Sequence, residues 1–96
     1  MYNPALHEAS YHNFEETIID LLSKSADIYY NHRRYGTALH TASVQGWEII
    51  VTILLANEAD PNIGGGRDGS EIQAASFNGH QRVVKSLLKN GVGVNF

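Results

Sequence analysis

The segment TALHTASVQGWEIIVTILLANEADPN, at residues 37–62, contains the pattern from which the fold can be inferred. Thr37 stands just ahead of a short stretch rich in alanine and leucine. A hydroxyl there is typical of the start of a helix, because its oxygen accepts from unpaired backbone N–H groups. Gly46 tolerates the left-handed backbone with which many helices end. The pattern therefore predicts a short helix between these two residues.

A second helix is predicted directly after Gly46. Ile50, Val51, Leu54 and Leu55 recur at the one- and four-residue spacing that places side chains on one face of a helix. Two short helices joined by a tight turn form an antiparallel pair, and such a pair cannot bury its apolar face alone. We therefore expect this pair to pack against neighbours of the same kind.

The same pattern recurs along the chain with a period of 33 residues. At this spacing ALHEAS (5–10) aligns with ALHTAS (38–43) and EIQAAS (71–76), Asn13 with Gly46 and Gly79, and Leu21-Leu22 with Leu54-Leu55 and Leu87-Leu88. Self-similarity at a fixed spacing indicates a repeat protein, for which about three units are the minimum. We predict an all-α solenoid of three stacked helix-turn-helix units joined by hairpin-like loops. It forms a single domain, residues 1–96, with repeats at about 4–36, 37–69 and 70–96.

Side chains inside the units support this stacking. Alanine recurs at Ala9, Ala42 and Ala75, where a small side chain would let the first helices of neighbouring units approach closely. The aromatic residues Phe14 and Trp47 share a phase in the repeat and are predicted to pack within the fold rather than to bind a partner.

The second helix of the first unit has two possible registers. Strict alignment places Thr17 and Asp20 at positions that hold isoleucine in the second unit, whereas a one-residue insertion near Glu15 would bring Ile18-Ile19 to the apolar positions. The sequence supports both. Neither end of the chain shows an evident polar capping face, so the chain resembles a slice of a longer array that exposes apolar surface at both ends.

Two segments between the predicted helix pairs, 27–36 and 60–69, are rich in turn-forming residues. We expect them to project as hairpin-like fingers. In the first finger, Tyr29, Tyr30 and Tyr35 could pack against one another and stiffen the loop, in which case at least one of these rings is not available for binding.

Taken together, these features resemble the ankyrin repeat, over residues 4–96. The residues that carry the resemblance are Thr37-Ala38-Leu39-His40, Ala42, Gly46, Ile50-Val51, Leu54-Leu55, Ala59-Asp60 and Asn62 in the second unit, and Gly79-His80, Val83-Val84, Leu87-Leu88, Lys89-Asn90-Gly91 and Asn95 in the third. Ala38 in place of the usual proline, Ser43 and Ser76 after the motif alanine, and Gly64-Gly65-Gly66 are more similar to ankyrin arrays of large fungal multidomain proteins.

The resemblance implies a non-catalytic module that binds another protein through its finger loops and the exposed face of its first helices. The candidate contact residues include aromatic and arginine side chains, which are enriched in binding hot spots. They are Tyr11, His12, Tyr30, Asn31, His32, Arg33, Arg34, Tyr35, Val44, Gln45, Arg67, Phe77 and Asn78. The alternative is a structural spacer or a fragment of a longer ankyrin array, whose neighbours would be further repeats. The identity of a partner does not follow from the sequence.

Chemical motifs in the sequence give no support for catalysis, a cofactor or a metal site. The chain has no cysteine, which excludes thiolate ligands and a catalytic thiol. Residues 64–69 satisfy the G-x-G-x-x-G pattern, but no acid follows at the required distance. Only His12 and His32 fall outside the repeat pattern, too few for a zinc site. The serine, histidine and glutamate within residues 7–10 point in different directions around one helical turn.

The net charge of -3 is unevenly distributed, with acids concentrated in residues 1–27 and the basic residues Arg82, Lys85 and Lys89 near the other end. We interpret these three as a solvated helix face, because an acidic chain lacks the basic footprint that nucleic acid requires. No apolar stretch approaches the roughly 20 residues that a bilayer requires, and no signal segment is evident. An intracellular location, cytoplasmic or nuclear, is predicted.

Overall fold

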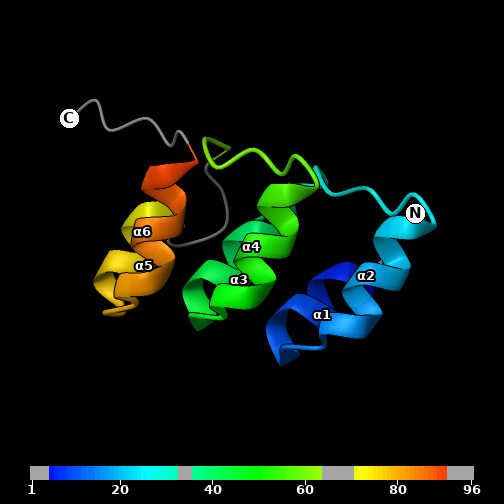
Figure 1. The fold of residues 1–96 in the computed structure, drawn as a ribbon, viewed down its shortest axis with the longest axis horizontal. Coiled ribbons are helices and arrows are strands. Elements are labelled where there is room, and N and C mark those ends of the chain that lie inside the picture. Colours follow the sequence, from blue (N-terminus) through cyan, green and yellow to red (C-terminus); the bar gives the residue numbers. More distant parts are fainter. Residues whose placement is uncertain (1–4, 33–35, 64–70, 91–96) are drawn as a thin grey trace.

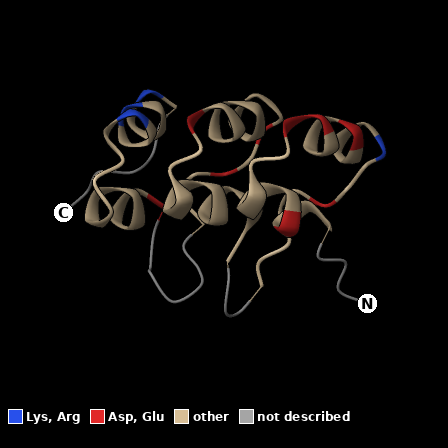
Figure 2. Ribbon diagram, turned by 90° about the horizontal axis from the view of Figure 1, so that it is seen from below, with Lys and Arg blue, Asp and Glu red and all other residues tan. Residues whose placement is uncertain are grey.

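The computed structural model describes residues 5–32, 36–63 and 71–90, and these residues contain six α-helices (Figure 1). The helices are α1 (Ala5–His12), α2 (Glu15–Ser23), α3 (Ala38–Gln45), α4 (Glu48–Ala56), α5 (Glu71–Phe77) and α6 (Gln81–Lys89). They form three antiparallel pairs, α1–α2, α3–α4 and α5–α6, which we call the first, second and third helix pair. The first helices form one layer and the second helices another (Figure 2). The all-α solenoid is confirmed.

The helices begin and end as the sequence predicts. The Thr37 hydroxyl accepts from the backbone N–H of His40 at 3.1 Å, so Thr37 caps α3. The turn residues Asn13, Gly46 and Gly79 have φ values of 63°, 79° and 73°, the left-handed conformation expected between the two helices of a pair.

The first helix pair keeps the strict register, without an insertion. α2 begins at Glu15 and α4 at Glu48, one full repeat later. Ile18 is fully buried, whereas Thr17 is exposed at the position where the second pair has the fully buried Ile50. Because Asn13 adopts the same left-handed turn as Gly46, the chain needs no extra residue to start α2 in phase.

The core runs through the stack between the two helix layers. Ala9, Ala42 and Ala75 are buried where α1 packs on α3 and α3 packs on α5, which confirms the expected close approach. On the second helices, Val51 and Leu54 are fully buried between neighbouring pairs. Each pair thus covers apolar surface that its neighbour could not bury alone.

The first finger is a hairpin-like loop. Its start is fixed by Asp27, whose carboxylate accepts from the backbone N–H of Tyr29 at 2.9 Å, and by Ile28, which is buried. His32 and Gly36 pair as an antiparallel bridge that closes the loop. The second finger begins in the same way, because Asp60 accepts from Asn62; residues 64–70 lie outside the described residues.

Candidate functional site

The last turns of α1, α3 and α5 carry one row of equivalent side chains, Tyr11, Val44 and Phe77. Tyr11 is 51% exposed and Phe77 is 91% exposed, whereas Val44 between them is half-buried. Their predicted neighbours His12, Gln45 and Asn78 follow them directly and are exposed except for the half-buried Gln45. The structure therefore brings these six predicted contact residues onto one side of the stack.

Contacts with the following helix pair hold the backbone of this row in place at Tyr11 and Val44. The indole Nε1 of Trp47 donates to the Tyr11 carbonyl at 2.8 Å. The Nε2 of His80 donates to the Val44 carbonyl at 2.9 Å. The imidazole of His12 packs edge-on against Tyr11, with ring centroids 5.0 Å apart. The row is thus pre-organised at Tyr11 and Val44, which lowers the entropy lost when a partner binds there.

The two described tyrosines of the first finger are anchored at different places. The hydroxyl of Tyr29 donates to the Glu58 carbonyl at the end of the second helix pair, at 2.8 Å. The ring of Tyr30 meets the imidazole of His7 edge-on, with centroids 6.0 Å apart. These two contacts tie the finger to residues outside it, whereas the packing of the tyrosines against one another stays a prediction. The long-range bond of Tyr29 could not be inferred from the repeat pattern.

His7 fastens the finger to α1. Its Nε2 donates to the Gly36 carbonyl at 2.7 Å, across the closing bridge of the loop. Burial lowers the pKa of His7 because the charged form is poorly solvated there, although the hydrogen bond to Gly36 acts in the opposite direction. His7 is therefore a neutral structural residue, as its place in the repeat motif predicts.

The remaining predicted finger residues divide into two groups. Asn31 is exposed and His32 is half-buried at the closing bridge. Arg33, Arg34, Tyr35 and Arg67 lie outside the described residues, so their contribution to a binding surface stays a prediction.

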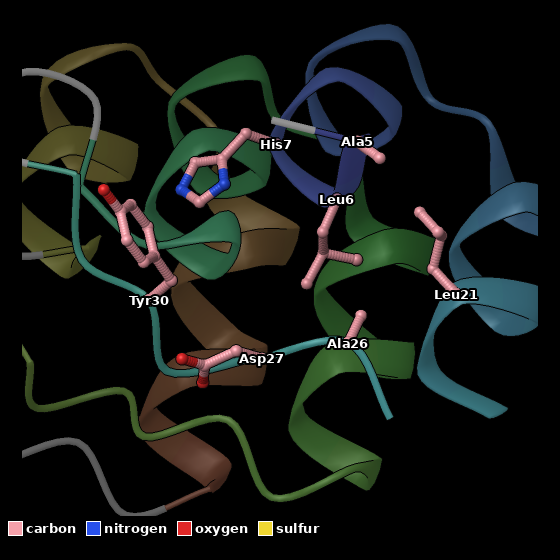
Figure 3. Close-up of a pocket in the computed structure, with 7 residues that line it drawn as sticks. All are labelled: Ala5, Leu6, His7, Leu21, Ala26, Asp27 and Tyr30. Atoms are coloured by element: carbon pink, nitrogen blue, oxygen red, sulfur yellow. The ribbon is translucent and has the colours of Figure 1, made fainter. Parts of the chain in front are cut away.

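The cavity in Figure 3 lies beneath the first finger, between α1 and α2. It measures about 180 Å³ and is lined by Ala5, Leu6, His7, Leu21, Ala26, Asp27 and Tyr30. Ligand pockets usually enclose about 300–1,000 Å³. The cavity is therefore too small for a typical cofactor.

Glu71 is a buried acid whose burial the repeat pattern does not predict. It opens α5 at the position where the first two pairs have alanine, and it is fully buried. Thr37 donates to its Oε1 at 3.4 Å, while no described residue hydrogen-bonds to its Oε2. Burial raises the pKa of Glu71 to about 7, and the nearby Asp60 charge acts in the same direction. The sequence signal for this residue is that an acid stands at the position where the first two repeats have alanine.

The hydrogen bond of the Ser10 hydroxyl indicates a structural role for this side chain. The Ser10 hydroxyl is buried and donates to the Leu6 carbonyl at 2.7 Å, so it does not face the His7 imidazole as a nucleophile would. Within the described ranges, no three histidine or acidic side chains gather as metal ligands.

Charge is separated along the second-helix layer (Figure 2). Arg82, Lys85 and Lys89 are exposed on α6, whereas the exposed acids Glu16 and Asp20 lie on α2. Arg82 makes one ion pair toward Glu48 of the preceding pair, at 3.6 Å. Exposed pairs of this kind contribute little stability, and the basic residues are interpreted as a solvated face.

Comparison with known proteins gives the class of the protein. A family model described as ankyrin repeats (3 copies) matches residues 5–96. The chain therefore belongs to the ankyrin repeat family, whose members are generally protein–protein interaction modules and typically non-catalytic. A search of curated proteins gave no match. The resemblance to fungal arrays stays a prediction from the sequence. None of the described helices has the length and apolar character needed to cross a bilayer.

Proposed function

We propose that this chain is a non-catalytic adaptor that binds one protein partner along the row Tyr11–Val44–Phe77 and the tip of the first finger. The observation that carries the proposal is the exposure of two aromatic rings, Tyr11 and Phe77, at equivalent positions of the first-helix layer. Exposed aromatic rings on a pre-organised surface are typical of binding hot spots. We place this activity inside the cell, because the chain has no cysteine for disulfides.

The chemistry of the row defines the kind of partner. Around Tyr11 and Phe77 the neighbouring residues of the last turns are His12, Gln45 and Asn78, which carry few charges. The partner segment should therefore present apolar side chains toward the rings and hydrogen-bonding groups toward the amides. This pattern agrees with the general anatomy of interfaces, where an apolar centre is surrounded by a polar rim.

Site-specific photo-crosslinking can test the proposal. A photoreactive phenylalanine analogue is placed at Tyr11, at Phe77 or at Thr52, which is exposed on the opposite helix layer. After irradiation in cells, partners crosslinked from positions 11 and 77 but not from position 52 are identified by mass spectrometry. The purified partner is then bound to the chain and its variants in solution.

The expected loss is largest for the rings. Tyr11→Ala and Phe77→Ala should each weaken binding by about 1–3 kcal/mol, and the triple alanine variant of Arg33, Arg34 and Tyr35 should also weaken it. Thr52→Ala serves as the matched control on the opposite layer. Equal affinity of all variants for the partner, with helical content unchanged, would exclude this surface.

The second candidate function is a spacer within a longer array. It is favoured by one observation, the exposed apolar residue Leu88 on the last described helix, at a position where Leu22 and Leu55 of the earlier pairs are half-buried. A spacer would yield no crosslinked partner at position 11.

A further inference from the structure

The second-helix layer has an outer side, which faces away from the first helices. Three equivalent positions of each second helix lie on this side, at the spacing that keeps side chains on one face of a helix. Every side chain at these positions is exposed. We call this surface the outer face; its residues are Glu16, Ile19 and Ser23 on α2, Ile49, Thr52 and Ala56 on α4, and Arg82, Lys85 and Lys89 on α6.

Charge changes in steps across the second-helix layer (Figure 2). The helix α2 has three acids and no base, α4 has the single acid Glu48, and α6 has three bases and no acid. Lys24 follows α2 and pairs with Asp20 at 3.1 Å, so it neutralises one of these acids. The layer is therefore acidic at α2, nearly uncharged at α4 and basic at α6.

The centre of the outer face carries no charge and exposes apolar side chains. Ile49 on α4 is 56% exposed, with Thr52 and Ala56 beside it on the same helix. On α2, Ile19 is 54% exposed. Removing such side chains from water is favourable, and interfaces commonly have a centre poor in charge within a polar rim. The outer face has this composition, with rims of opposite charge.

The bases of α6 have few partners within the chain. Arg82 makes one exposed ion pair with Glu48, at 3.6 Å, and its guanidinium has five N–H donors, so it can also bind a second carboxylate. Lys85 and Lys89 make no ion pair with any residue that the structure describes. Because they are four residues apart on one helix, their charges repel each other. An acidic surface placed over α6 would relieve this repulsion.

A second copy of the chain carries the charges that complement this surface. Two copies can meet at their outer faces about a two-fold axis in two ways. If the axis runs along the stack, α2 lies on α2 and α6 lies on α6, so like charges meet. If the axis runs along α4, the two α4 helices meet at the centre, and the acidic α2 of each copy lies on the basic α6 of the other. Only the second arrangement has complementary charges, and two-fold pairing is the commonest form of dimer.

We propose that the outer face is the interface of a weak symmetric dimer, in which α4 packs on α4 and α2 of each copy packs on α6 of the other. Glu16 of one copy faces Arg82 of the second copy, because these residues are two full repeats apart and an axis along α4 keeps them at the same level. Ile49 and Thr52 lie beside the axis. The inference goes beyond the proposed function, since the row Tyr11–Val44–Phe77 lies on the first-helix layer and is left uncovered in both copies.

Sedimentation of the purified full chain tests whether the dimer forms. The apolar centre is small and the flanking ion pairs are exposed, so we expect a dissociation constant between about 1 μM and about 1 mM. Analytical ultracentrifugation over this range of protein concentration measures it. Raising the NaCl concentration from about 20 mM to about 500 mM should weaken the dimer about tenfold, because salt screens exposed charges.

Charge reversal tests the arrangement of the two copies. Glu16→Lys and Arg82→Glu should each weaken self-association about tenfold or more, because each change creates two contacts between like charges in the dimer. An equimolar mixture of the two variants should associate again, since both contacts of the mixed dimer then join opposite charges. The matched control is Glu8→Lys, which makes the same change of charge at an exposed residue of α1 and should leave the dimer intact. Circular dichroism checks that every variant keeps its helices.

Crosslinking tests the position of the axis. The chain has no cysteine, so Thr52→Cys introduces one unique thiol. A short bismaleimide should join this residue to Thr52→Cys of a second copy, because two packed helices lie about 8–10 Å apart. Glu8→Cys on α1 is the control and should give no crosslinked dimer at the same protein concentration.

The proposal is overturned by a chain that stays monomeric at about 1 mM, the weakest dimer expected. It is also overturned if Glu16→Lys associates as well as Glu8→Lys, or if the mixture of Glu16→Lys and Arg82→Glu stays monomeric. Association into species larger than a dimer would point to contacts at the ends of the stack and not to the outer face. All these measurements use the purified chain alone, so none of them bears on the binding of another protein at Tyr11 and Phe77, and the two proposals can fail separately.

Discussion

The second helix pair has a neighbour on each side, whereas the described part of the first pair has a neighbour on one side only. Leucine at equivalent positions shows the consequence: Leu54 is fully buried, but Leu21 is only half-buried at the uncovered end. The two residues occupy equivalent positions of the repeat, on α2 and on α4. Burial in a stacked protein is therefore set by the neighbouring pair and not by the unit itself.

The largest expected difference between these pairs concerns their leucines. Leu54→Ala should lower the free energy of unfolding by about 2–5 kcal/mol, because it removes a fully buried side chain and leaves a cavity. Leu21→Ala should cost clearly less, since water already reaches that side chain. Urea denaturation gives both values, with Thr52→Ala as an exposed control expected within about 0.5 kcal/mol of the original chain. Equal losses in the free energy of unfolding for Leu21→Ala and Leu54→Ala would contradict the conclusion that the neighbouring pair sets burial.

The second effect concerns the junction between the second and third pairs, where Glu71 is buried. Its pKa of about 7 lies above the ordinary value of 4.5, so the folded state binds the proton more tightly than the unfolded state. The contribution of Glu71 to stability should therefore fall as the pH rises from about 4.5 through about 7, and then level off. Glu71→Gln should remove this dependence and be more stable than the original chain at pH 8, by about 1–3 kcal/mol.

Urea midpoints of both proteins between pH 5 and pH 8 check the Glu71 prediction. The difference between the two curves isolates Glu71 from other groups. This matters because His7, whose pKa is lowered by burial, contributes stability that is lost as the pH falls. Asp60→Asn is a useful second variant, since removing that charge should lower the pKa of Glu71 and shrink the difference. Parallel curves for the original chain and Glu71→Gln would contradict the prediction.

A smaller effect on stability is expected from the indole of Trp47, which donates a hydrogen bond to the preceding helix pair. Trp47→Phe keeps an aromatic ring but removes the hydrogen bond to the Tyr11 carbonyl, which should cost about 1 kcal/mol. The reverse change, Phe14→Trp, adds the same donor at the end where the structure describes no carbonyl of a preceding pair, and should leave stability unchanged. Thermal unfolding of the two variants gives the comparison. A gain in stability from Phe14→Trp would contradict this expectation.

The smallest expected effect lies just after the second helices. Glu58 has a φ of 69°, in the left-handed region that costs free energy for a residue with a Cβ. Glu58→Gly should stabilise the chain by about 0.5 kcal/mol, because the relief of strain exceeds the added freedom of the unfolded state. Glu58→Ala keeps the strain and is the matched control. Identical melting temperatures of the glycine and alanine variants would argue against strain at this position.

Much of the fold could be predicted because its signals are local. Thr37 caps α3, Gly46 and Asn13 end their helices in the left-handed conformation, and the alanine positions pack as expected. Of the candidate binding residues, the pairs on the last turns of the first helices were placed together correctly, since equivalent positions of a repeat must lie on one side. Whether they bind a partner stays a prediction.

Other features depended on contacts that a repeat pattern does not contain. Tyr29 reaches the end of α4, and Glu71 lies buried beside Thr37 of the preceding pair. The register of α2 was also open, because Ile18 and Ile19 are equally apolar and only packing against α4 buries the first and exposes the second.

The sequence by itself determined the period, the helix pairs, the turns and the repeat family, because each of these follows from residues close together in the chain. Only the tertiary structure decided which equivalent side chains are buried and which acid loses its solvent. The physical reason is that burial and desolvation are properties of the contact between helix pairs, and that contact depends on side chains one repeat away.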